Sequence, residues 1–588
     1  MSSRVDFPSS EGPEGSRVPP SVTAVPQWVL HPNRAPETAA GLARALGAPL
    51  ALGHALVNRG VANEDQARRY LDPVLEDLHE PGEMLDLERA AERILAGVEG
   101  GEPIFVHGDY DVDGITSTFL LYSALEELGA RVEYRIPHRI RDGYGLTTEA
   151  IDHAHRRGCR LVVTVDCGIT ATEAVAYAKQ LGIDTVITDH HEPPASLPDA
   201  LAIVNPLRRG CPYPFKSLAG VGVTFKLVER LLKGRGGLDR ARRYLDAVAL
   251  GTIADVVPLV GENRVLARLG LDRLNHEPRL GLRALIDVSS LQGKRITAGH
   301  VAFVLAPRIN AAGRMGNAEQ GLRLLLARDP EEAEAIARSL EEDNLQRRRF
   351  DEKVLQEAIR QVEEETGYPQ CSSILLWSDR WHPGVIGIVA SRLVERFQRP
   401  TVLVAIDGDK GRGSGRSLPG LDLTRLLDGC GDLLLAHGGH AFAAGLSVRR
   451  ERLPELRERL ERLVREQGRP DQFVQRLELD GELRASECDM ELVEWIERMA
   501  PHGLDNTEPV FRMTDARLDQ VQEVGAGKHL RLRARDDSGE VEAIGFGMGE
   551  SARALARVGR ADLAFVPTRN DWSGEARVQL KLKGTRIP

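Results

Sequence analysis

The sequence predicts an α/β protein with two strand-and-helix regions, a long connecting helix and a small C-terminal β-barrel. Two patterns carry this prediction. From about residue 101 to 259, short β-branched segments alternate with amphipathic helical segments, which is typical of a parallel sheet covered by helices. From about residue 473, apolar residues recur at every second position and are joined by turn-rich DDSG and NDWSG, which indicates a β-barrel or sandwich.

The first region contains strand-like and helical segments in alternation. The strand-like segments are IFVH, VEYRI, RLVVTV, DTVIT and LAIVN, and the helical segments are ITSTFLLYSALEEL, TTEAIDHAHRR and TATEAVAYAKQL. The former are rich in Val and Ile, and the latter place their apolar residues at helical spacing. Because strands that are separated by helices usually pair in parallel, we expect a parallel sheet here.

Two further segments complete the α/β part. Residues 330–365 are charged and helical, and we expect one long connecting helix there. Its apolar stripe fits an interdomain spacer or a dimer seam, and consists of Ile336, Leu340, Val354, Ala358 and Val362. A second α/β unit follows from about residue 371 to 467, with strands near ILLW and TVLVAI and a closing helix at LPELRERLERLVREQ.

Length and composition indicate a folded, multidomain protein. A chain of 588 residues is too long for a single core, and we expect about three domains. With 42% hydrophobic and 28% charged residues it can bury sizeable cores, and no apolar stretch approaches the length that spans a bilayer. We therefore expect a soluble protein with no membrane partner.

The N-terminal segment and the cysteines predict a cytoplasmic location. The first 36 residues are rich in Pro, Ser and Gly and lack the apolar core of a signal peptide, so we expect a disordered leader. The six cysteines show neither CxxC pairs nor zinc-ligand spacing, and a chain of this size does not need disulfides. Reduced thiols are therefore expected.

The net charge of −10 argues against a protein that coats duplex nucleic acid. However, carboxylates gathered at a metal site lower the net charge without repelling a phosphate chain once cations are bound. Any contact with nucleic acid is therefore expected to follow a local basic track.

The most informative segment is FVHGDYDVDG, in which an apolar strand ends in His107, Asp109, Asp111 and Asp113. Carboxylates this close together repel one another in a low dielectric unless a cation lies between them. Oxygen and imidazole donors together suit Mg²⁺ or Mn²⁺. A solvated acidic turn or a calcium loop is the alternative, but a calcium loop is closed by a distant Glu, whereas here an apolar helix is expected from near Ile115.

Two later strands end in the same residue types. Asp166 follows RLVVTV, and Asp189, His190 and His191 follow DTVIT. The carboxyl ends of the strands form the binding crevice of an open α/β sheet, so these side chains are expected to converge. Asp255 lies alone in ALGTIADVVPL, and Asp166 or Asp255 taken singly is more often a cap or turn residue than a ligand. Together with the other strand ends, they predict a metal site.

These segments resemble a known family. DYDVDG, VDCG, TDHH and GTIADVVPL resemble the four metal motifs of the DHH phosphoesterase superfamily. APRINAAGRMGNA, WHPGVIGIVASRL, GRGSGRS and HGGHAFAAG resemble motifs of its RecJ single-strand exonucleases, including the DHH-associated domain, DHHA1. The resemblance implies a leader at residues 1–36, a DHH catalytic domain at 37–329, a connecting helix at 330–368, a DHHA1 domain at 369–468 and an OB-like nucleic-acid-binding domain at 469–588.

The resemblance also implies an active site with two ions, Mn²⁺ or Mg²⁺, and a shared bridging carboxylate. In the implied ligand set, the first ion takes His107, Asp111 and Asp166, and the second takes Asp113, Asp166, His190 and Asp255.

The remaining residues of these motifs have supporting roles in this interpretation. His191 resembles the second DHH histidine, which donates a hydrogen bond to the reacting phosphate or the leaving oxygen, and a structural histidine is the alternative. Asp189 is expected to fix a histidine tautomer, and Asp109 either does the same or caps the loop. His107 is the least secure ligand, because the family tolerates an apolar residue at that position.

Candidate phosphate contacts are arginines and small polar residues in glycine-containing segments, since arginine forks suit phosphate oxygens. A lone arginine is by default a surface ion-pair residue, and core packing explains the histidines equally well. The family implies that the GRGSGRS segment and nearby arginines hold a 5′ phosphate. The candidates are Arg139 in PHRIRDGYG, Arg308, Asn310 and Arg314 in the loop-like APRINAAGRM, Ser414 and Arg416 in GRGSGRS, and His382 and His440 in WHPG and HGGH.

The residues alone lead to a two-metal phosphodiester hydrolase. The resemblance adds a 5′→3′ exonuclease that degrades single-stranded DNA to mononucleotides in DNA repair and recombination, with a strand carrying a 5′ end as partner and a single-strand-binding protein and a helicase as further candidates. One alternative is a phosphodiesterase for short oligonucleotides or cyclic dinucleotides, which the full length and the β-rich tail disfavour. The other alternative is a catalytically inactive replication scaffold. The complete set of metal-ligand types disfavours this alternative.

Overall fold

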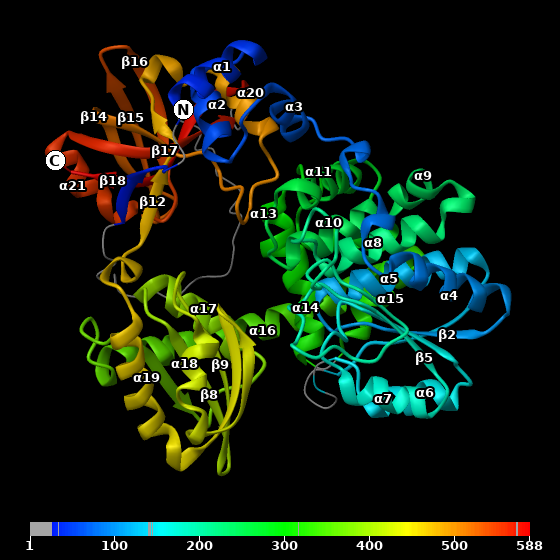
Figure 1. Ribbon diagram of the computed structural model, residues 1–588. Helices are drawn as coiled ribbons and strands as arrows, with labels where there is room; N and C mark the ends of the chain where they lie inside the picture. The colour runs from blue at the N-terminus through cyan, green and yellow to red at the C-terminus, as the bar shows by residue number, and fades with distance from the viewer. Residues whose placement is uncertain are drawn as a thin grey trace. The chain divides into compact units, whose positions relative to one another are not determined.

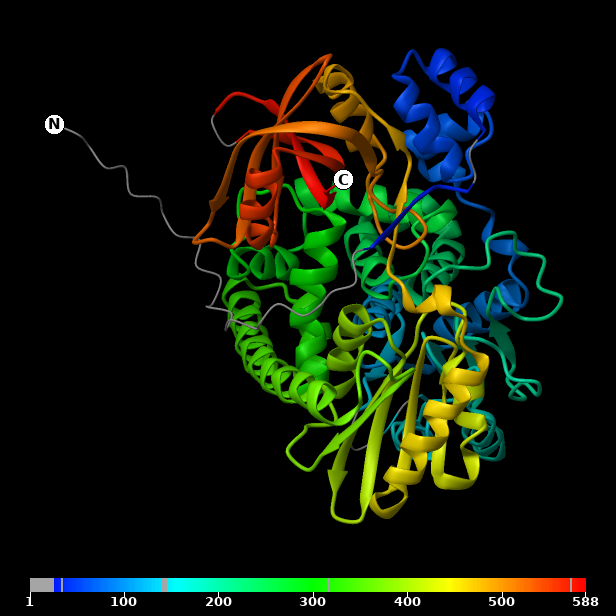
Figure 2. The same cartoon turned by 90° about the vertical axis from the view of Figure 1, so that its left-hand side faces the viewer.

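The computed structural model describes residues 26–32, 35–138, 143, 145–315, 317–571 and 574–587. Internal contacts divide the chain into two compact units, a larger one with residues 28–347 and 478–588 and a smaller one that includes residues 348–477. Figures 1 and 2 show their helices and strands. Among the described residues, no helix combines the length and the apolar character that a membrane span requires.

A five-stranded parallel sheet lies at the centre of residues 28–347 of the larger unit, as the sequence predicts. In spatial order its strands are β3 (Arg131–Arg135), β2 (Pro103–His107), β4 (Leu161–Val165), β5 (Asp184–Thr188) and β6 (Ala202–Val204). All neighbouring pairs are parallel. The chain order reverses direction between β2 and β4, and ligands of open α/β sheets bind outside the carboxyl ends of strands at such a switch point.

Helices cover both faces of this sheet because successive strand residues point to opposite sides. Ile104 packs into a core formed with α5 (Val112–Leu128), α8 (Gly220–Leu231) and α10 (Leu245–Ala254), whereas Phe105 packs with α6 (Thr148–Arg156) and α7 (Thr172–Gln180). Figure 1 shows α6 and α7 together on one side of the sheet and α4 (Leu87–Glu99) and α5 on the other.

More helices surround this core. They are α9 (Gly237–Ala241), α11 (Gly261–His276), α12 (Leu280–Val288), α13 (Ala298–His300), α14 (Ala306–Met315) and α15 (Glu319–Leu326). Helices α1 (Pro36–Leu46), α2 (Leu50–Asn58) and α3 (Glu64–Leu71) pack on one another, and α2 contacts the C-terminal part of this unit. Upstream, β1 (Gln27–Leu30) pairs with β12 (Arg476–Leu479). This strand falls within the leader expected to be disordered, so that expectation is wrong for residues 27–30, and residues 1–25, 33 and 34 lie outside the described part.

The APRINAAGRM segment corrects the sequence-based expectation of a loop, because it forms helix α14. Pro307 would clash with the carbonyl four residues earlier in a regular α-helix. A wider π-helical turn at Val301–Leu305 precedes it and joins α13 to α14. We attribute the continuous helix to this turn, which makes room for the proline ring and leaves Phe303 83% exposed.

The smaller unit contains the second α/β fold that the sequence predicts. Helix α16 (Pro330–Glu365) is the expected connecting helix, and it leads to a sheet with the order β10 (Leu434–His440), β11 (Ala443–Arg449), β9 (Lys410–Arg416), β8 (Thr401–Asp407) and β7 (Ile374–Ser378). The sheet is flanked by α17 (Ile386–Phe397), α18 (Leu423–Asp428) and α19 (Leu453–Gln467). GRGSGRS, expected as an anion-binding loop, is strand β9, and HGGH lies at the end of β10.

The C-terminal part of the larger unit is a closed barrel, as the period-two pattern predicts. Its strands are β14 (Phe511–Val524), β15 (His529–Asp536), β16 (Gly539–Gly545), β18 (Arg577–Arg586) and β17 (Arg560–Asn570), and β17 pairs back to β14. The short β13 (Gly481–Glu482) adds to β14, and helices α20 (Met490–Arg498) and α21 (Ala552–Val558) accompany the barrel. Figure 2 shows these strands in orange and red.

An arginine joins the sheet-containing part of the larger unit to the barrel region. The Arg264 guanidinium of α11 donates to the carbonyl oxygens of residues 498–501, which follow or end α20, at 2.8–3.4 Å. It also lies over the Tyr70 ring, 3.9 Å from the ring centroid. One buried cation therefore satisfies the carbonyls at the end of α20, which have no partner within their own helix.

Candidate metal centre

The acidic and imidazole side chains lie where the parallel strands end. Strand β2 ends at His107 and leads into Asp109 and Asp111, β4 is followed by Asp166, and β5 is followed by Asp189, His190 and His191. Asp255 follows the last residue of α10. Because β2, β4 and β5 are adjacent, their shared sheet edge collects side chains between His107 and His191, which span about 85 positions of the chain.

Three overlapping groups of these residues bring their ligand atoms within 4.8 Å of one another. The groups are Asp109, Asp111 and Asp166; Asp113, His190 and Asp255; and Asp166, His190 and His191. The second and third together contain every residue implied for the second ion. The first contains Asp109 in the place expected for His107.

His190 lies at the centre of the carboxylates. Its Nε2 atom is 3.2 Å from Asp166 Oδ1, 3.6 Å from Asp255 Oδ2 and 3.9 Å from Asp113 Oδ2. Several oxygens around one imidazole nitrogen leave room for a small cation that would be shared among them.

Local backbone structure sets the first part of the site. Helix α5 begins at Val112, not near Ile115 as expected, so Asp111 caps it by accepting a hydrogen bond from the Gly114 amide at 3.0 Å. Asp113 consequently lies in the first helical turn and not in a loop. A Cβ on Gly114 would lie 2.6 Å from the Asp109 backbone, so only glycine allows this tight crossing.

Asp113 is held by the start of another helix. The amides of Gly220 and Val221, the first two residues of α8, each donate to one oxygen of its carboxylate at 2.7 Å. Carboxylates are stabilised at helix N-termini. These donors were not identified from the sequence, because nothing in LAGVG points to a residue more than 100 positions upstream.

Burial makes the negative charge of this site costly. Burial, and next the charge of Asp111, raises the pKa of Asp113 to about 7, although its two amide hydrogen bonds act in the opposite direction. Burial also raises the pKa of Asp166 and of Asp255 well above the ordinary range, and in both the Asp113 charge adds to the effect. Cations would remove this cost.

The donor set therefore fits divalent ions. The Oδ1 atom of Asp166 is fully buried and accepts no hydrogen bond from the residues that the structure describes. A buried carboxylate oxygen with no donor is costly unless a metal ion is bound there. Five carboxylates and two imidazoles suit Mg²⁺ or Mn²⁺ better than zinc, which prefers thiolate and imidazole ligands.

Asp189 orients His191. The His191 Nδ1 atom lies 2.7 Å from Asp189 Oδ1, and that carboxylate also accepts hydrogen bonds from the amides of Ile169, His190 and His191. Burial opposes both charges, but the contact lowers the pKa of Asp189 and raises the pKa of His191. The arrangement fits the role expected for Asp189, which is to fix a histidine tautomer.

His107 does not join the carboxylates as expected. The three groups found among the described residues do not include it. Its Nε2 atom lies 3.1 Å from the carbonyl oxygen of Gly145, and its side chain is buried. Asp109 takes the place expected for His107 beside Asp111 and Asp166.

The APRINAAGRM helix lies against the metal loop. Asn310 Oδ1 accepts a hydrogen bond from the Val112 amide at 3.2 Å, and a Cβ on Gly313 would be 2.8 Å from the carbonyl oxygen of Tyr110. Arg308 is buried, forms an ion pair with Glu341 and donates to the carbonyl oxygen of Val304.

Of the two other phosphate contacts expected in this region, the structure describes one. Arg314 is half-buried in the last turn of α14. Arg139 lies outside the described residues.

The candidate phosphate contacts of the smaller unit lie on β9, β10 and the segment before α17. Arg416 donates to Ser414 Oγ at 3.2 Å, and a Cβ on Gly387 would be 2.9 Å from that oxygen. Gly387 therefore lets the first turn of α17 approach both side chains. His382 accepts a hydrogen bond from the Gly384 amide and stacks on Phe350, and His440 ends β10.

The larger unit contains a large cavity that was not predicted from the sequence. The cavity has a volume of about 1000 Å³ and lies between α11 and α13 on one side and α20 and barrel residues on the other. Arg268, Arg295, Phe303 and Lys581 are among its lining residues. Neither arginine has a carboxylate within ion-pair distance among the described residues, and both burial and the nearby charge of Arg295 lower the pKa of Arg268.

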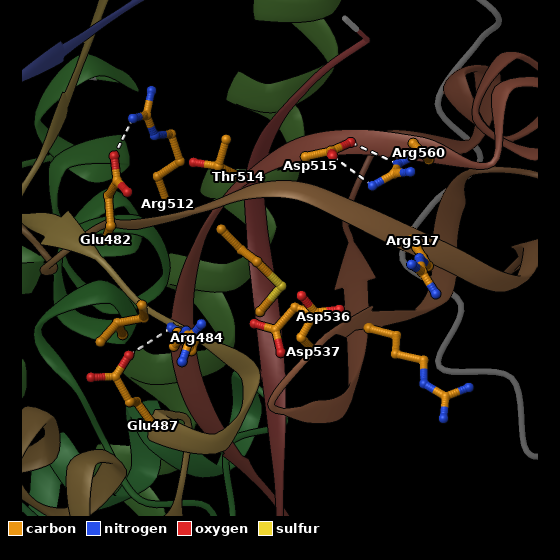
Figure 3. Close-up of a pocket in the computed structure, with 13 residues that line it drawn as sticks. Glu482, Arg484, Glu487, Arg512, Thr514, Asp515, Arg517, Asp536, Asp537 and Arg560 are labelled. Carbon is orange, nitrogen blue, oxygen red and sulfur yellow. Dashed lines mark hydrogen bonds and ion pairs between the residues drawn. The ribbon is translucent and has the colours of Figure 1, made fainter.

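The barrel also carries an arginine cluster, shown in Figure 3. Arg517 on β14 lies directly opposite Arg535 on β15 and Arg560 on β17. Arg560 is paired with Asp515, and Arg512 with Glu482. These residues line a hollow of about 360 Å³, in which like charges face each other across strands at an energetic cost.

Family models match most of this architecture. The DHH family N-terminal domain matches residues 103–252, the DHHA1 domain residues 368–466 and the RecJ OB domain residues 479–584.

Curated relatives match over nearly the whole chain. The single-stranded-DNA-specific exonuclease RecJ of Bacillus subtilis is 38% identical over 535 residues, which cover 90% of this chain and 67% of the relative. The protein of the same name from Escherichia coli is 36% identical and covers 90% of this chain and 95% of the relative.

A solved structure matches the fold at similar coverage. RecJ from Thermus thermophilus in complex with Mn²⁺ has a TM-score of 0.83 and 32% sequence identity, and the match covers 96% of this chain and 80% of that chain. The Mg²⁺ complex of the same protein has a TM-score of 0.77.

Proposed function

The chain belongs to the RecJ family of single-strand-specific exonucleases, and on that premise we propose that it degrades single-stranded DNA from the 5′ end to mononucleotides with the aid of Mn²⁺ or Mg²⁺. The observation that carries this proposal is the convergence of Asp113, Asp166, His190 and Asp255 at the ends of the parallel strands. The names of the relatives and the ions of the solved structures support it.

Bound divalent ions would lower the pKa of a shared water and stabilise the charge that develops at phosphorus. Asp111 and Asp166, with Asp109 or His107, are the proposed ligands of one ion, and Asp113, Asp166, His190 and Asp255 those of the other. The amide hydrogen bonds to Asp113 fix its ligand oxygens before the substrate arrives.

His191 is proposed to assist the leaving group. Its Nδ1 atom is occupied by Asp189, so Nε2 is the ring atom that can donate a hydrogen bond to the phosphate or the leaving oxygen. The hydrogen bond to the Asp189 carboxylate favours the protonated imidazole that such a donor needs, although burial opposes it.

Arg416 and Ser414 are proposed to bind the terminal 5′ phosphate. The guanidinium and the hydroxyl lie 3.2 Å apart beside the first turn of α17, where backbone amides add donors for an anion. His382 and His440 belong to the same unit and are proposed to contribute further contacts.

In the larger unit, Asn310 and Arg314 are proposed as phosphate contacts on α14, and Arg139, which lies outside the described residues, is proposed as a further phosphate contact. Asn310 already touches the metal loop through the Val112 amide. Arg308 would have to exchange Glu341 for a phosphate oxygen, because its guanidinium is engaged in the absence of substrate.

The path of the strand away from the metal centre is proposed to use the large cavity. Phe303 lies seven residues before Asn310 on one continuous helix, which corresponds to about 10 Å. An exposed aromatic ring stacks on bases, and unpaired arginines contact phosphates. The facing arginines Arg517 and Arg535 of the barrel would lose their mutual repulsion on an anionic strand.

We also propose a cytoplasmic location and two protein partners, a single-strand-binding protein and a helicase. The partners are proposed because such an enzyme needs strands that have been separated and kept open.

The proposed domains are residues 37–329, 330–368, 369–468 and 469–588. The three matched family models support this division.

The deciding experiment is a time course on single-stranded DNA labelled at either end, with Mn²⁺ and with a chelator, and with products separated by length. Mononucleotides released from the 5′ end only with metal are the expected result. Hydrolysis of dinucleotides or cyclic dinucleotides without degradation of the strand would contradict the proposal and move the activity to small substrates. No metal-dependent hydrolysis at all would leave a scaffold role.

A further inference from the structure

Helix α8 starts directly beside two of the candidate metal ligands. The amide of Gly220 donates to Asp113 Oδ2 and the amide of Val221 to Asp113 Oδ1, both at 2.7 Å. Each oxygen of this carboxylate therefore has a fixed donor on one side. The carboxylate plane cannot rotate without breaking one of the two hydrogen bonds.

The same glycine leaves space for the other ligand. A Cβ placed on Gly220 would lie 2.3 Å from Asp166 Oδ1 and 2.7 Å from both Asp166 Cβ and Cγ. Real Cβ atoms do not approach other atoms so closely, so any other residue at position 220 would displace the Asp166 carboxylate. Asp166 itself has a φ of 59°, a left-handed conformation that is unusual for aspartate and directs its side chain toward α8.

A second glycine, Gly251, also lies close to Asp113. A Cβ on Gly251 of α10 would lie 2.2 Å from Thr116 Oγ1, 2.9 Å from Val221 Cγ1 and 3.1 Å from Asp113 Oδ1. Helices α5, α8 and α10 thus meet at Asp113 at a distance that only glycine permits. Gly251 lies four residues before Asp255, which completes the same group of ligands.

From these contacts we propose that Gly220 is a positioning residue of the metal centre, which fixes Asp113 through its amide and Asp166 through its missing side chain. Gly251 supports it by setting the distance between Asp113 and α10. Asp113 and Asp166 thus lie on either side of the backbone at Gly220. This role explains why a glycine begins α8, although glycine has a low helix propensity.

A purely structural explanation is that these glycines only allow close helix packing. Gly222 provides the comparison, since it lies in the same turn of α8 and is also buried. A Cβ there would meet the Leu218 side chain at 3.0 Å, and no metal ligand is among its three nearest neighbours. A leucine side chain can shift by a few tenths of an ångström, so Gly222→Ala is a matched control.

The test compares Gly220→Ala with Gly222→Ala in the full-length protein, and it rests on the metal centre of the proposed function. Mn²⁺ binding without DNA is measured by calorimetry, and the exchange coupling of bridged Mn²⁺ pairs by electron paramagnetic resonance. For Gly220→Ala we expect Mn²⁺ affinity at least 100-fold weaker, fewer than two ions bound and no exchange-coupled signal. For Gly222→Ala we expect two ions with affinities within threefold of the parent protein.

The new Cβ of Gly220→Ala would lie 2.7 Å from Asp166 Cβ, which moves only together with its backbone, so we expect a local shift of the segment after β4 in a protein that remains folded. Circular dichroism and thermal melts of the metal-free protein check this. Gly251→Ala is a second variant, for which we expect loss of the ion at Asp113, His190 and Asp255 and retention of the other. If either folded variant binds two ions as the parent does, the proposed positioning role is wrong.

The outcomes separate this inference from the proposed function. Two ions bound by the parent protein and by either folded glycine variant would overturn only the positioning role. If the parent protein binds no Mn²⁺, the proposed metal centre itself is wrong, and the positioning role of Gly220 and Gly251 is wrong with it.

Discussion

The Nε2 atom of His190 lies 3.2 Å from Oδ1 of Asp166, an oxygen that is fully buried and accepts no hydrogen bond from the described residues. Asp166 belongs to two of the three ligand groups, one with Asp109 and Asp111 and one with His190 and His191. A side chain shared in this way should affect both ions when it is changed.

Asp166→Asn should therefore abolish hydrolysis while the fold survives. We expect a loss of roughly 1000-fold or more in kcat/KM, because the developing charge at phosphorus loses its stabilisation. The metal-free variant should be more stable than the parent by about 1–2 kcal/mol, since one crowded, buried carboxylate is gone. Hydrolysis assays and thermal melts with and without Mn²⁺ measure the two effects.

The control for this change is Asp199→Asn, at a surface carboxylate that pairs with Lys179. It should leave both hydrolysis and the Mn²⁺-dependent shift in melting temperature as in the parent. Near-normal turnover by folded Asp166→Asn would contradict the metal assignment.

Arg416→Ala should chiefly weaken the use of 5′-phosphorylated ends. A charge-assisted hydrogen bond contributes about 1.5–3 kcal/mol, so KM for a phosphorylated strand should rise by roughly 10- to 100-fold. Strands with a 5′ hydroxyl should be affected much less. Arg449→Ala, at an exposed arginine of the same sheet, is the control, and an equal effect of Arg416→Ala on both kinds of end would reject the terminal-phosphate role.

Phe303→Ala should weaken the binding of long strands. Base stacking on an aromatic ring contributes about 1–3 kcal/mol per base, which predicts a dissociation constant roughly 5- to 100-fold higher for an oligonucleotide that reaches the cavity. Di- and trinucleotides that occupy only the metal centre should be hydrolysed as before. Phe303→Trp should retain binding, and if strands of every length lose affinity equally, the path through the cavity is incorrect.

The stability of the barrel region should fall in mild acid because of His502. Burial lowers the pKa of His502 to about 4, whereas the unfolded chain binds this proton near the ordinary value of 6.5. The stabilisation from a neutral His502 is thus fully present above pH 6.5 and is lost as pH falls through about 4. The full effect is at most about 3 kcal/mol.

Hydrogen exchange in α20 and β14, measured between pH 7 and 4 and corrected for intrinsic rates, would report this loss. His502→Gln should flatten the pH dependence of protection, whereas His276→Gln, at an imidazole that is 71% exposed, should not. An unchanged slope in His502→Gln would show that another group titrates.

Local pattern was enough to predict the elements of this protein. The β-branched strand segments, the stripe along α16 and the alternation in β15, β16 and β18 follow from periods of two or 3.6 residues, which short stretches of chain contain. The carboxylates and histidines were visible because they follow directly after strands, and parallel pairing brings strand ends to one edge.

Pattern failed where neighbours distant in the chain decide the outcome. APRINAAGRM has the composition of a loop, but the π turn before Pro307 lets it continue as a helix. GRGSGRS has the composition of a loop too, but it pairs with β8 and β11 on both sides and becomes a strand.

The sequence by itself therefore determined the α/β class, the barrel, the family and the residue types of a metal centre, because each is encoded in spacing along the chain. Tertiary structure alone decided that Asp109 lies with Asp111 and Asp166, that Arg308 is paired with Glu341, and that the amides of Gly220 and Val221 hold Asp113. These are contacts of a few ångströms between elements that lie up to about 100 residues apart. The packing of α8 and α10 against the sheet brings these side chains and amides within contact distance of one another.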